Sequence, residues 1–308
     1  MKVCMVGEGA MGNAHMSTLS QMQEIEVVTV AGGLPNDTTA FAEKWKIPHH
    51  SLSLEECLSR DGVEAAILTS PNQIHADQAA LCVEMGKHVL IEIPMGLNLE
   101  ESSRVAALED SGLVVMVCHS LRYAPAHREL RRRVAEGELH PHHLVAHTYF
   151  LRRENVNMFG NPRTWTDDLL WHQACHTIDY IYWLFGNEGM QTWAQAGPLH
   201  DKLQIPMDMT IGMRSNTGAL ATVAMSFNNH GTISVDFRLI GEENTYLIAG
   251  GKLTDWEGNE IESKDPGPGQ DQDFFNAIKT GTKPLTSVGA CLPVMGLLDS
   301  LQQSIDAG

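Results

Sequence analysis

The sequence predicts an α/β protein in two parts, a doubly wound parallel sheet followed by an α+β domain with a large, mostly antiparallel sheet. One observation is a short apolar strand, Lys2–Val6, that runs directly into the G-x-G-x-x-G turn Gly7–Gly12. Another is an alternation of strand-length apolar runs with helix-length segments as far as residue 119. Beyond it, strand-like segments follow one another across short turns. Since 308 residues exceed one ordinary core, we predict two domains, a Rossmann dinucleotide-binding domain at 1–120 and a second, α+β domain at 121–308.

The first part contains predicted strands joined by helical crossovers. Strands of a parallel sheet are buried on both faces, and each therefore appears as a continuous apolar run. Gly86 and Lys87 indicate the end of a helix just before one of these runs. The predicted strands are Val3–Val6, Glu26–Ala31, Ala65–Thr69, His88–Ile91 and Val114–Cys118, and the predicted helices are Met11–Gln23, Thr38–Trp45, Leu54–Leu58, Ala76–Met85 and Leu99–Asp110.

The second part is predicted to be richer in strands. Turn sequences at Ser215–Gly218 and Gly241–Asn244 indicate hairpins between neighbouring strands. The tail, Gln272–Ala307, is predicted to be helical with a break at Gly281–Pro284, and to pack on either domain. The other predicted helices are Pro125–Glu136 and Asp167–Phe185, and the predicted strands are Leu144–Leu151, Thr192–Ala196, Asp208–Met213, Ala219–Phe227, Ile233–Ile240 and Tyr246–Ala249.

Composition restricts the class of protein. The net charge of −17 argues against a nucleic-acid or anionic-membrane partner, because such surfaces attract basic proteins. No apolar run reaches the ~20 residues that cross a bilayer. The six cysteines are scattered without a C-x-x-C pair, and no basic, apolar leader precedes the first strand. We expect a soluble cytoplasmic protein.

The glycine turn predicts a dinucleotide site. Its glycines permit a tight turn, close approach of the backbone to a pyrophosphate, and close packing of helix on strand, while Ala10 and Met11 begin a helix whose N–H groups face phosphate. An acid normally ends the second strand and binds the ribose 2′-hydroxyl of NAD, but Val30–Leu34 contains none. Asn36, Thr38 and Thr39 can donate hydrogen bonds to a 2′-phosphate instead. This favours NADP, leaves NAD open, and makes Asp37 the position to test.

Several motifs agree with one known family. Thr69–His75 is similar to a T-P-N-x-x-H loop, Gly86–Pro94 to G-K-H-V-x-x-E-K-P, and His172–Asp179 to D-x-x-x-H-x-x-D. Over essentially its whole length the chain resembles the glucose-fructose oxidoreductase / inositol dehydrogenase (Gfo/Idh/MocA) family. The resemblance implies an NAD(P)-dependent dehydrogenase whose cofactor is lined by Gly7, Gly9, Ala10, Met11, Gly12, Thr69, Ser70, Pro71, Asn72 and His75, with Glu92 and Pro94 near the nicotinamide.

Two departures from the family pattern affect the chemistry. Ile93 replaces the lysine of E-K-P, and His172 replaces the aspartate four residues before the active-site histidine, His176. Two imidazoles at i and i+4 share one helix face, and an imidazole suits general-base catalysis near neutral pH. We expect His176 to be the base, with His172 as the second candidate and Asp168 orienting His172. We expect no metal, because spacing marks no third ligand.

The longest matches lie on the predicted substrate side. They are Tyr149–Asn155, Pro162–His172, Met207–Met209 and Ser226–Asn229, and they resemble a subgroup that oxidises a cyclic hemiacetal with two carboxylates to a lactone. Guanidinium groups bind carboxylates bidentately. The resemblance therefore implies a small dicarboxylate substrate held by Arg122, Arg152, Arg153 and Arg163, with Trp165 or Tyr149 stacking on the ring and Asn155 or Asn229 adding hydrogen bonds. Arg128, Arg131–Arg133 and His140–His143 are assigned to the surface.

Two other functions stay open. A sugar or cyclitol dehydrogenase of the same family would act on a neutral ring and would not need several arginines. A non-catalytic sensor that binds a dinucleotide is compatible with Ile93, but His176 argues against it. The resemblance also implies a homodimer or higher homo-oligomer that packs through the open sheet.

Overall fold

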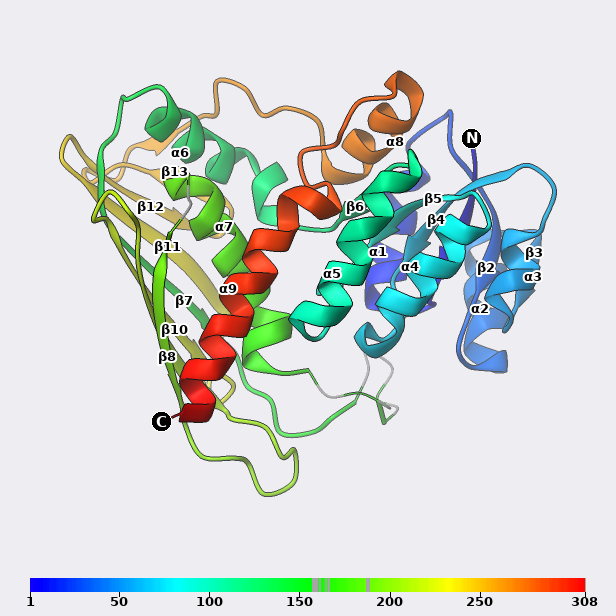
Figure 1. Ribbon diagram of the computed structural model, residues 1–308, viewed down its shortest axis with the longest axis horizontal. Helices are drawn as coiled ribbons and strands as arrows, with labels where there is room; N and C mark the ends of the chain where they lie inside the picture. The colour runs from blue at the N-terminus through cyan, green and yellow to red at the C-terminus, as the bar shows by residue number, and fades with distance from the viewer. Residues whose placement is uncertain (157–159, 161, 164, 166, 187–188, 308) are drawn as a thin grey trace. The chain divides into compact units, whose positions relative to one another are not determined.

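The computed structural model describes residues 1–156, 160, 162–163, 165, 167–186 and 189–307. It divides into two compact units, shown in Figure 1. Unit 1 comprises residues 1–118, 156–165 and 270–292, and unit 2 comprises residues 119–155, 166–269 and 293–308. Among the described helices, none combines the length and the apolar character needed to cross a bilayer.

Unit 1 is built on a six-stranded parallel sheet with the order β3-β2-β1-β4-β5-β6. This confirms the predicted doubly wound parallel sheet. The central strands are almost completely buried, as continuous apolar runs predict. The strands are β1 (Lys2–Val6), β2 (Glu26–Ala31), β3 (His49–Ser51), β4 (Val63–Leu68), β5 (His88–Ile91) and β6 (Val115–Val117), and the helices are α1 (Ala10–Leu19), α2 (Pro35–Trp45), α3 (Leu54–Leu58), α4 (His75–Glu84), α5 (Leu99–Ala107) and α8 (Gln270–Thr280).

The segment after α8 is joined to the edge strand of this sheet. Val117 N donates to Thr286 O at 2.9 Å, and the Thr286 hydroxyl donates to Val117 O at 2.6 Å. Ser287 forms an antiparallel bridge with Met116. Unit 1 is therefore completed by residues far along the chain. The next helix, α9 (Val288–Ala307), begins in unit 1 and ends in unit 2.

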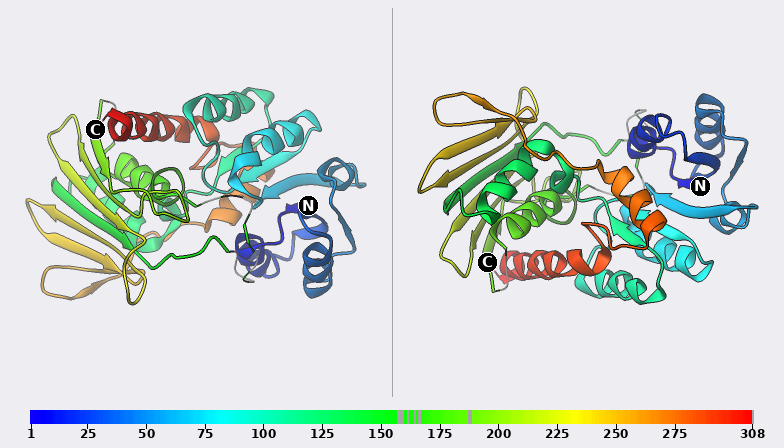
Figure 2. Two further views of the ribbon diagram at one scale, coloured as in Figure 1. Left: turned by 90° about the horizontal axis from the view of Figure 1, so that it is seen from below. Right: turned by 90° about the horizontal axis from the view of Figure 1, so that it is seen from above.

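Unit 2 contains an eight-stranded sheet with the order β14-β13-β12-β11-β7-β10-β9-β8. Among the described strands of this sheet, only β7 and β10 pair in parallel, so the predicted mostly antiparallel sheet is confirmed. Figure 2 shows helices α6 (Pro125–Ala135) and α7 (Cys175–Phe185) against one face of it. The strands are β7 (Pro141–Tyr149), β8 (Gln191–Ala196), β9 (Asp208–Arg214), β10 (Leu220–Ser226), β11 (Ser234–Gly241), β12 (Thr245–Ala249), β13 (Lys252–Thr254) and β14 (Glu260–Ile261).

The opposite face of this sheet carries exposed apolar side chains. Along β7, Leu144 and Ala146 are buried while Val145 is exposed, because successive side chains of a strand point to opposite faces. The strand register places Trp193, Leu220 and Ile240 on the face of Val145. The homo-oligomer through this sheet stays a prediction.

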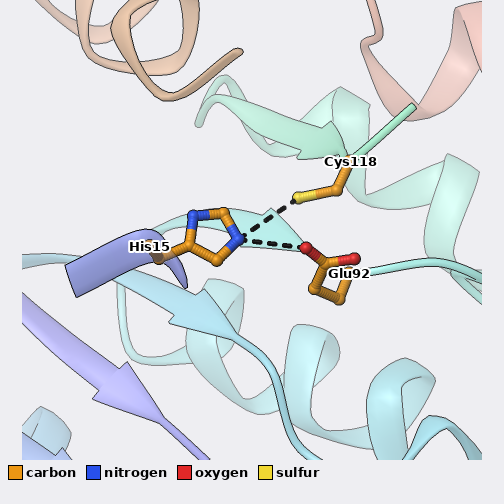
Figure 3. A group of neighbouring side chains, drawn as sticks. All are labelled: His15, Glu92 and Cys118. Atoms are coloured by element: carbon orange, nitrogen blue, oxygen red, sulfur yellow. Dashed lines mark hydrogen bonds and ion pairs between the residues drawn. The ribbon is translucent and has the colours of Figure 1, made fainter. Parts of the chain in front are cut away.

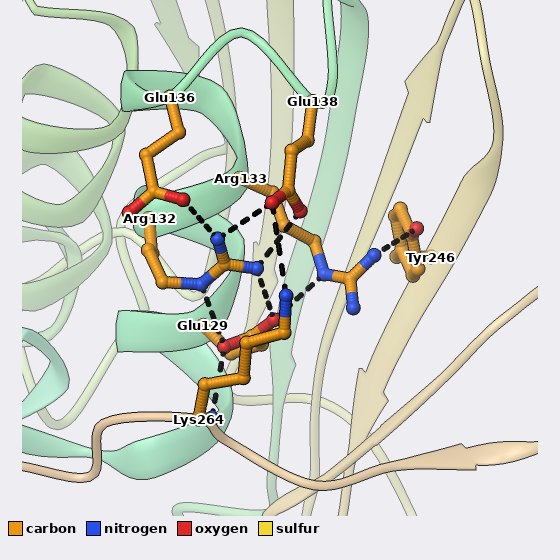
Figure 4. A network of polar contacts seen from close by, with 7 residues as sticks. All are labelled: Glu129, Arg132, Arg133, Glu136, Glu138, Tyr246 and Lys264. Carbon is orange, nitrogen blue, oxygen red and sulfur yellow. Dashed lines mark hydrogen bonds and ion pairs between the residues drawn. The ribbon is translucent and has the colours of Figure 1, made fainter.

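A network of charges fixes α6 to its neighbours. Glu129 is buried, and one of its oxygens accepts hydrogen bonds of 2.8 Å from both Arg132 and Arg133, as Figure 4 shows. The other oxygen accepts from the backbone N–H of Lys264 at 3.1 Å. Arg133 continues to the hydroxyl of Tyr246 on β12 at 2.8 Å. These arginines were assigned to the surface from the sequence, and the structure shows that they hold a buried carboxylate.

We expect Glu129→Gln to lower the free energy of unfolding by about 2 kcal/mol, because charge-assisted hydrogen bonds to a buried group are lost. Glu136→Gln is the matched control, since Glu136 pairs with the same Arg132 but is mostly exposed. Exposed pairs contribute little, so the control should change stability by less than about 0.5 kcal/mol. Urea unfolding followed by circular dichroism measures both, and equal effects would contradict the assignment.

Candidate active site

The glycine turn has the three features that a pyrophosphate site requires. Gly7 has φ of +102°, and a Cβ there would lie 2.6 Å from the carbonyl oxygen of Thr69. A Cβ on Gly12 would lie 2.4 Å from the carbonyl oxygen of Gly7, so α1 packs closely on the turn. A Cβ on Gly9 would meet no described atom within 4 Å, which leaves its backbone open to a ligand. Gly9 also precedes the first residues of α1, Ala10 and Met11. The turn therefore fits a dinucleotide.

The loops after β4 and β5 meet at His75. Its Nδ1 lies 2.9 Å from Pro94 O, and its Nε2 lies 2.9 Å from Ser70 O. Thr69 ties the same region to the glycine turn, because its hydroxyl donates to Val6 O at 2.9 Å and is 3.1 Å from Gly7 O. The next residues, Pro71 and Asn72, lead into the 3₁₀ turn Asn72–Ile74. The structure thus brings together the predicted cofactor residues of three segments.

A buried charge cluster supports Glu92, which follows β5. His15 of α1 has Nε2 at 3.0 Å from Glu92 and Nδ1 at 2.9 Å from Asp271 of α8. Figure 3 shows the Cys118 sulfur on the same side of the imidazole as Glu92, 3.9 Å from Nε2. The side chains of His15, Glu92 and Cys118 gather closely enough to hold a metal ion. Both ring nitrogens of His15 already face carboxylates, however, and burial raises the pKa of the Cys118 thiol, which disfavours a thiolate ligand.

The charge on His15 follows from its partners. Burial disfavours the charged ring, but hydrogen bonds with Asp271 and Glu92 outweigh burial and raise its pKa to about 10. His15 is therefore an imidazolium that joins α1, the end of β5 and α8. Sequence reasoning missed this cluster, because its members are far apart in the chain.

In unit 2, the candidate catalytic residues begin a helix whose first turn is π-helical. This turn spans Leu169–Ala174 and continues into α7. Asp168 lies in an extended conformation just before it and accepts a hydrogen bond from Trp171 N at 2.7 Å. π-Helical turns are rare in proteins overall, and those that occur often lie at functional sites.

The carboxylate paired with His172 is that of Asp167. The Asp167 carboxylate lies 2.8 Å from His172 Nδ1 and also pairs with Arg152 and Gln173. Burial alone would raise the pKa of Asp167, but hydrogen bonding and the charges of His172 and Arg152 hold it below its ordinary value. The prediction for Asp168 assumed helical spacing from Asp168 to His172. The structure places Asp168 at the cap of the helix that begins at Leu169, where its carboxylate accepts from Trp171 N.

The second imidazole of the pair, that of His176, is half-buried on α7 beside the buried polar side chains of His119 and Asp179. Its ring makes an edge contact with that of His119, 6.3 Å between centroids. Arg122 donates to Asp179 of the same helix through two hydrogen bonds, Nε at 2.8 Å and Nη2 at 2.6 Å. Both partners are almost fully buried. The guanidinium group of Arg122 is therefore bound bidentately to a carboxylate of the protein itself.

The other predicted substrate residues have different surroundings. Arg153 is exposed and donates to the carbonyl oxygens of Arg152 and Phe227. Arg163 stacks on Trp165, 4.8 Å from the ring centroid, and both belong to unit 1. Tyr149 stacks on His147 and lines a surface hollow of about 410 Å³ with Asn229 and neighbouring residues of β9 and β10. By strand alternation it points to the sheet face opposite Thr148.

Comparison with known proteins agrees with these features. Residues 1–119 match the family described as "Oxidoreductase family, NAD-binding Rossmann fold", and residues 125–265 match "Bacterial oxidoreductases, C-terminal". The chain belongs to the Gfo/Idh/MocA family, as its motifs predict, and is an NAD(P)-dependent dehydrogenase.

Its relatives differ in the substrates that they are named for. The chain is 35% identical over 313 residues to 4-carboxy-2-hydroxymuconate-6-semialdehyde dehydrogenase of Sphingobium sp., covering 99% of each chain. It is 23% identical over 305 residues to inositol 2-dehydrogenase of Salmonella typhimurium, covering 92% of this chain and 88% of that one. Levoglucosan dehydrogenase in complex with NADH shares the fold, with a TM-score of 0.87 at 19% identity and coverage of 100% and 97%.

We expect His15→Asn to lower the free energy of unfolding by about 3–5 kcal/mol near neutral pH, because two buried carboxylates lose their cation. The loss depends on pH. A folded pKa of about 10, against an ordinary 6.5, means that the imidazolium stabilises fully below about pH 6.5 and ceases to do so as pH rises through 10.

Urea unfolding at pH 6, 8 and 10 measures the difference in free energy of unfolding between the wild type and His15→Asn. This difference should become smaller as pH rises. The control is His50→Asn, because His50 is an exposed histidine of unit 1 that contacts Thr39. A difference that stays constant from pH 6 to pH 10 would show that His15 is not held as an imidazolium.

Proposed function

We propose that the protein oxidises the cyclic hemiacetal of 4-carboxy-2-hydroxymuconate-6-semialdehyde to 2-pyrone-4,6-dicarboxylate, with NAD or NADP as the oxidant. The observation that carries the proposal is the carboxylate–imidazole pair Asp167–His172 one helical turn before His176. The full-length similarity to the Sphingobium enzyme supports the choice of substrate.

The reaction removes a hydride from the anomeric carbon and a proton from its hydroxyl oxygen, so that the C–O single bond becomes the lactone carbonyl. A bound nicotinamide supplies the hydride acceptor. We assign the proton to His176, which occupies the position of the active-site histidine in the family motif. Because Ile93 has no ammonium group, we assign the acceptance of this proton to the imidazole pair.

His172 has a defined role beside this base. Asp167 lies at its Nδ1 and fixes the orientation of the ring, and we assign to His172 the positioning of the substrate hydroxyl. Arg152 pairs with the same carboxylate and keeps it ionised. Arg153 and Arg163 are the remaining candidates for the substrate carboxylates, because Arg122 is committed to Asp179.

A sugar or cyclitol dehydrogenase is the second candidate. Similarity to inositol 2-dehydrogenase over most of both chains favours it. The imidazole at position 172 and the absence of a lysine at position 93 favour the semialdehyde, since both depart from the general family motif.

The proposal is tested by absorbance at 340 nm with NAD or NADP and semialdehyde freshly prepared by 4,5-cleavage of protocatechuate. Rapid reduction of the cofactor is the expected result, with 2-pyrone-4,6-dicarboxylate as the product by chromatography. myo-Inositol and glucose are the comparison substrates. No reduction with the semialdehyde, from protein shown to bind cofactor, would contradict the proposal, and turnover of a neutral ring would establish the second candidate.

We expect His176→Ala to lower kcat by about 10²–10⁴-fold, the range for loss of a general base. Asp167→Asn should lower it by about 10–100-fold, because His172 loses the carboxylate that orients its ring. Cofactor affinity by calorimetry should not change in either variant. His142→Ala, at an exposed histidine, is the control. A greater loss from His172→Ala than from His176→Ala would reverse their roles.

A further inference from the structure

The end of β2 contains a carboxylate that the local sequence does not provide. Glu8, the second residue of the glycine turn, extends across to the segment that follows β2. Its Oε1 accepts hydrogen bonds from Gly33 N at 2.9 Å and Leu34 N at 3.0 Å. Thr38 of α2 adds a longer contact of 3.5 Å to the same oxygen. All these residues belong to unit 1.

Gly32, the first residue after β2, makes room for this arrangement. A Cβ on Gly32 would lie 1.9 Å from the Thr38 hydroxyl, so a larger residue there would displace Thr38. A Cβ on Gly33 would lie 3.8 Å from Glu8 Oε1. The acid that ends β2 in many dinucleotide-binding domains is thus absent from the strand, and a carboxylate from the glycine turn lies in the same region of the fold.

The two carboxylate oxygens are used unequally. Oε1 receives two short backbone hydrogen bonds, while Oε2 receives one contact of 3.1 Å from Gly33 N within the part of the chain that the structure describes. A carboxylate oxygen can accept two hydrogen bonds. Oε2 therefore retains the capacity to accept one from a hydroxyl group, and Glu8 is only half-buried.

We propose that Glu8 is the residue that selects NAD over NADP, by accepting a hydrogen bond from the adenosine ribose and by excluding a 2′-phosphate. The phosphate carries up to two negative charges and would face the carboxylate. It would also compete for the Gly33 and Leu34 amides, which Glu8 already occupies. The sequence favoured NADP because no acid ends β2, and the structure shows that the acid comes from another segment.

This inference rests on dinucleotide binding, the part of the proposed function that comes before any choice of substrate. Calorimetric titration with NAD and with NADP, in the absence of substrate, therefore tests it separately. The wild type should bind NAD at least about tenfold more tightly than NADP, which corresponds to one favourable hydrogen bond or one charge repulsion. Equal affinities, or tighter binding of NADP, would overturn the proposal.

Variants locate the preference. Glu8→Gln keeps the length and an acceptor oxygen but removes the charge, and it should reduce the ratio of the two affinities by about tenfold, mainly through tighter NADP binding. Glu8→Asp keeps the charge and should retain most of the preference for NAD. Asp37→Asn is the matched control, because it removes a carboxylate from the first turn of α2 and should leave the ratio within about twofold.

Thermal unfolding shows that each variant is folded before it is titrated. An unchanged ratio in folded Glu8→Gln would overturn the proposal. An equal change in Asp37→Asn would also overturn it, since the selection would then depend on the general charge of the helix end and not on the Glu8 site. If Glu8→Gln does not fold, the ratio of NAD to NADP affinity in the wild type and in Glu8→Asp tests the proposal. A wild type without a preference for NAD, or a Glu8→Asp variant that loses it, would overturn the proposal.

Discussion

The imidazolium of His15 is the interaction on which unit 1 depends most. It joins the helix after the glycine turn to the residue after β5 and to a helix from the end of the chain. The cofactor turn and the E-I-P segment come from different parts of the sequence, so something must fix one against the other. A buried cation between two carboxylates fixes both the distance and the orientation of these segments, because each ring nitrogen faces one carboxylate. Replacing such a group with apolar residues would keep the packing but lose that geometry.

Unit 2 follows the same logic with guanidinium groups. Asp179 receives the fork of Arg122, Asp167 receives Arg152, and Glu129 receives Arg132 and Arg133. In a chain with a net charge of −17, acidic side chains outnumber basic ones, and these arginines form ion pairs with carboxylates of the protein itself. This explains why a count of arginines near a motif overestimates the cations at a binding site. It also explains why a helix that appears exposed in the sequence carries internal ion pairs.

The sequence was sufficient for the architecture, because long apolar runs and the glycine turn are local signals. The strands Glu26–Ala31 and His88–Ile91 were predicted to the residue. The short strands β3 and β13 were missed, since each has only three residues and pairs through its backbone, without an apolar run. Asp167 and Glu8 were missed for another reason. Their roles depend on where a helix starts and on how far a side chain reaches across the sheet, and neither is encoded in local spacing.

The late position of residues 270–292 has a consequence for synthesis of the protein. Asp271 completes the His15 cluster, and Thr286 completes the edge of β6, yet both are made after almost all of unit 2. On the ribosome, the glycine turn emerges well before these partners and lacks them until residues 270–292 have been made. The whole sheet of unit 2 has been made by then, although residues 293–308 of that unit follow later still. The cofactor turn therefore gains its last partners only after the sheet of the other unit has been translated.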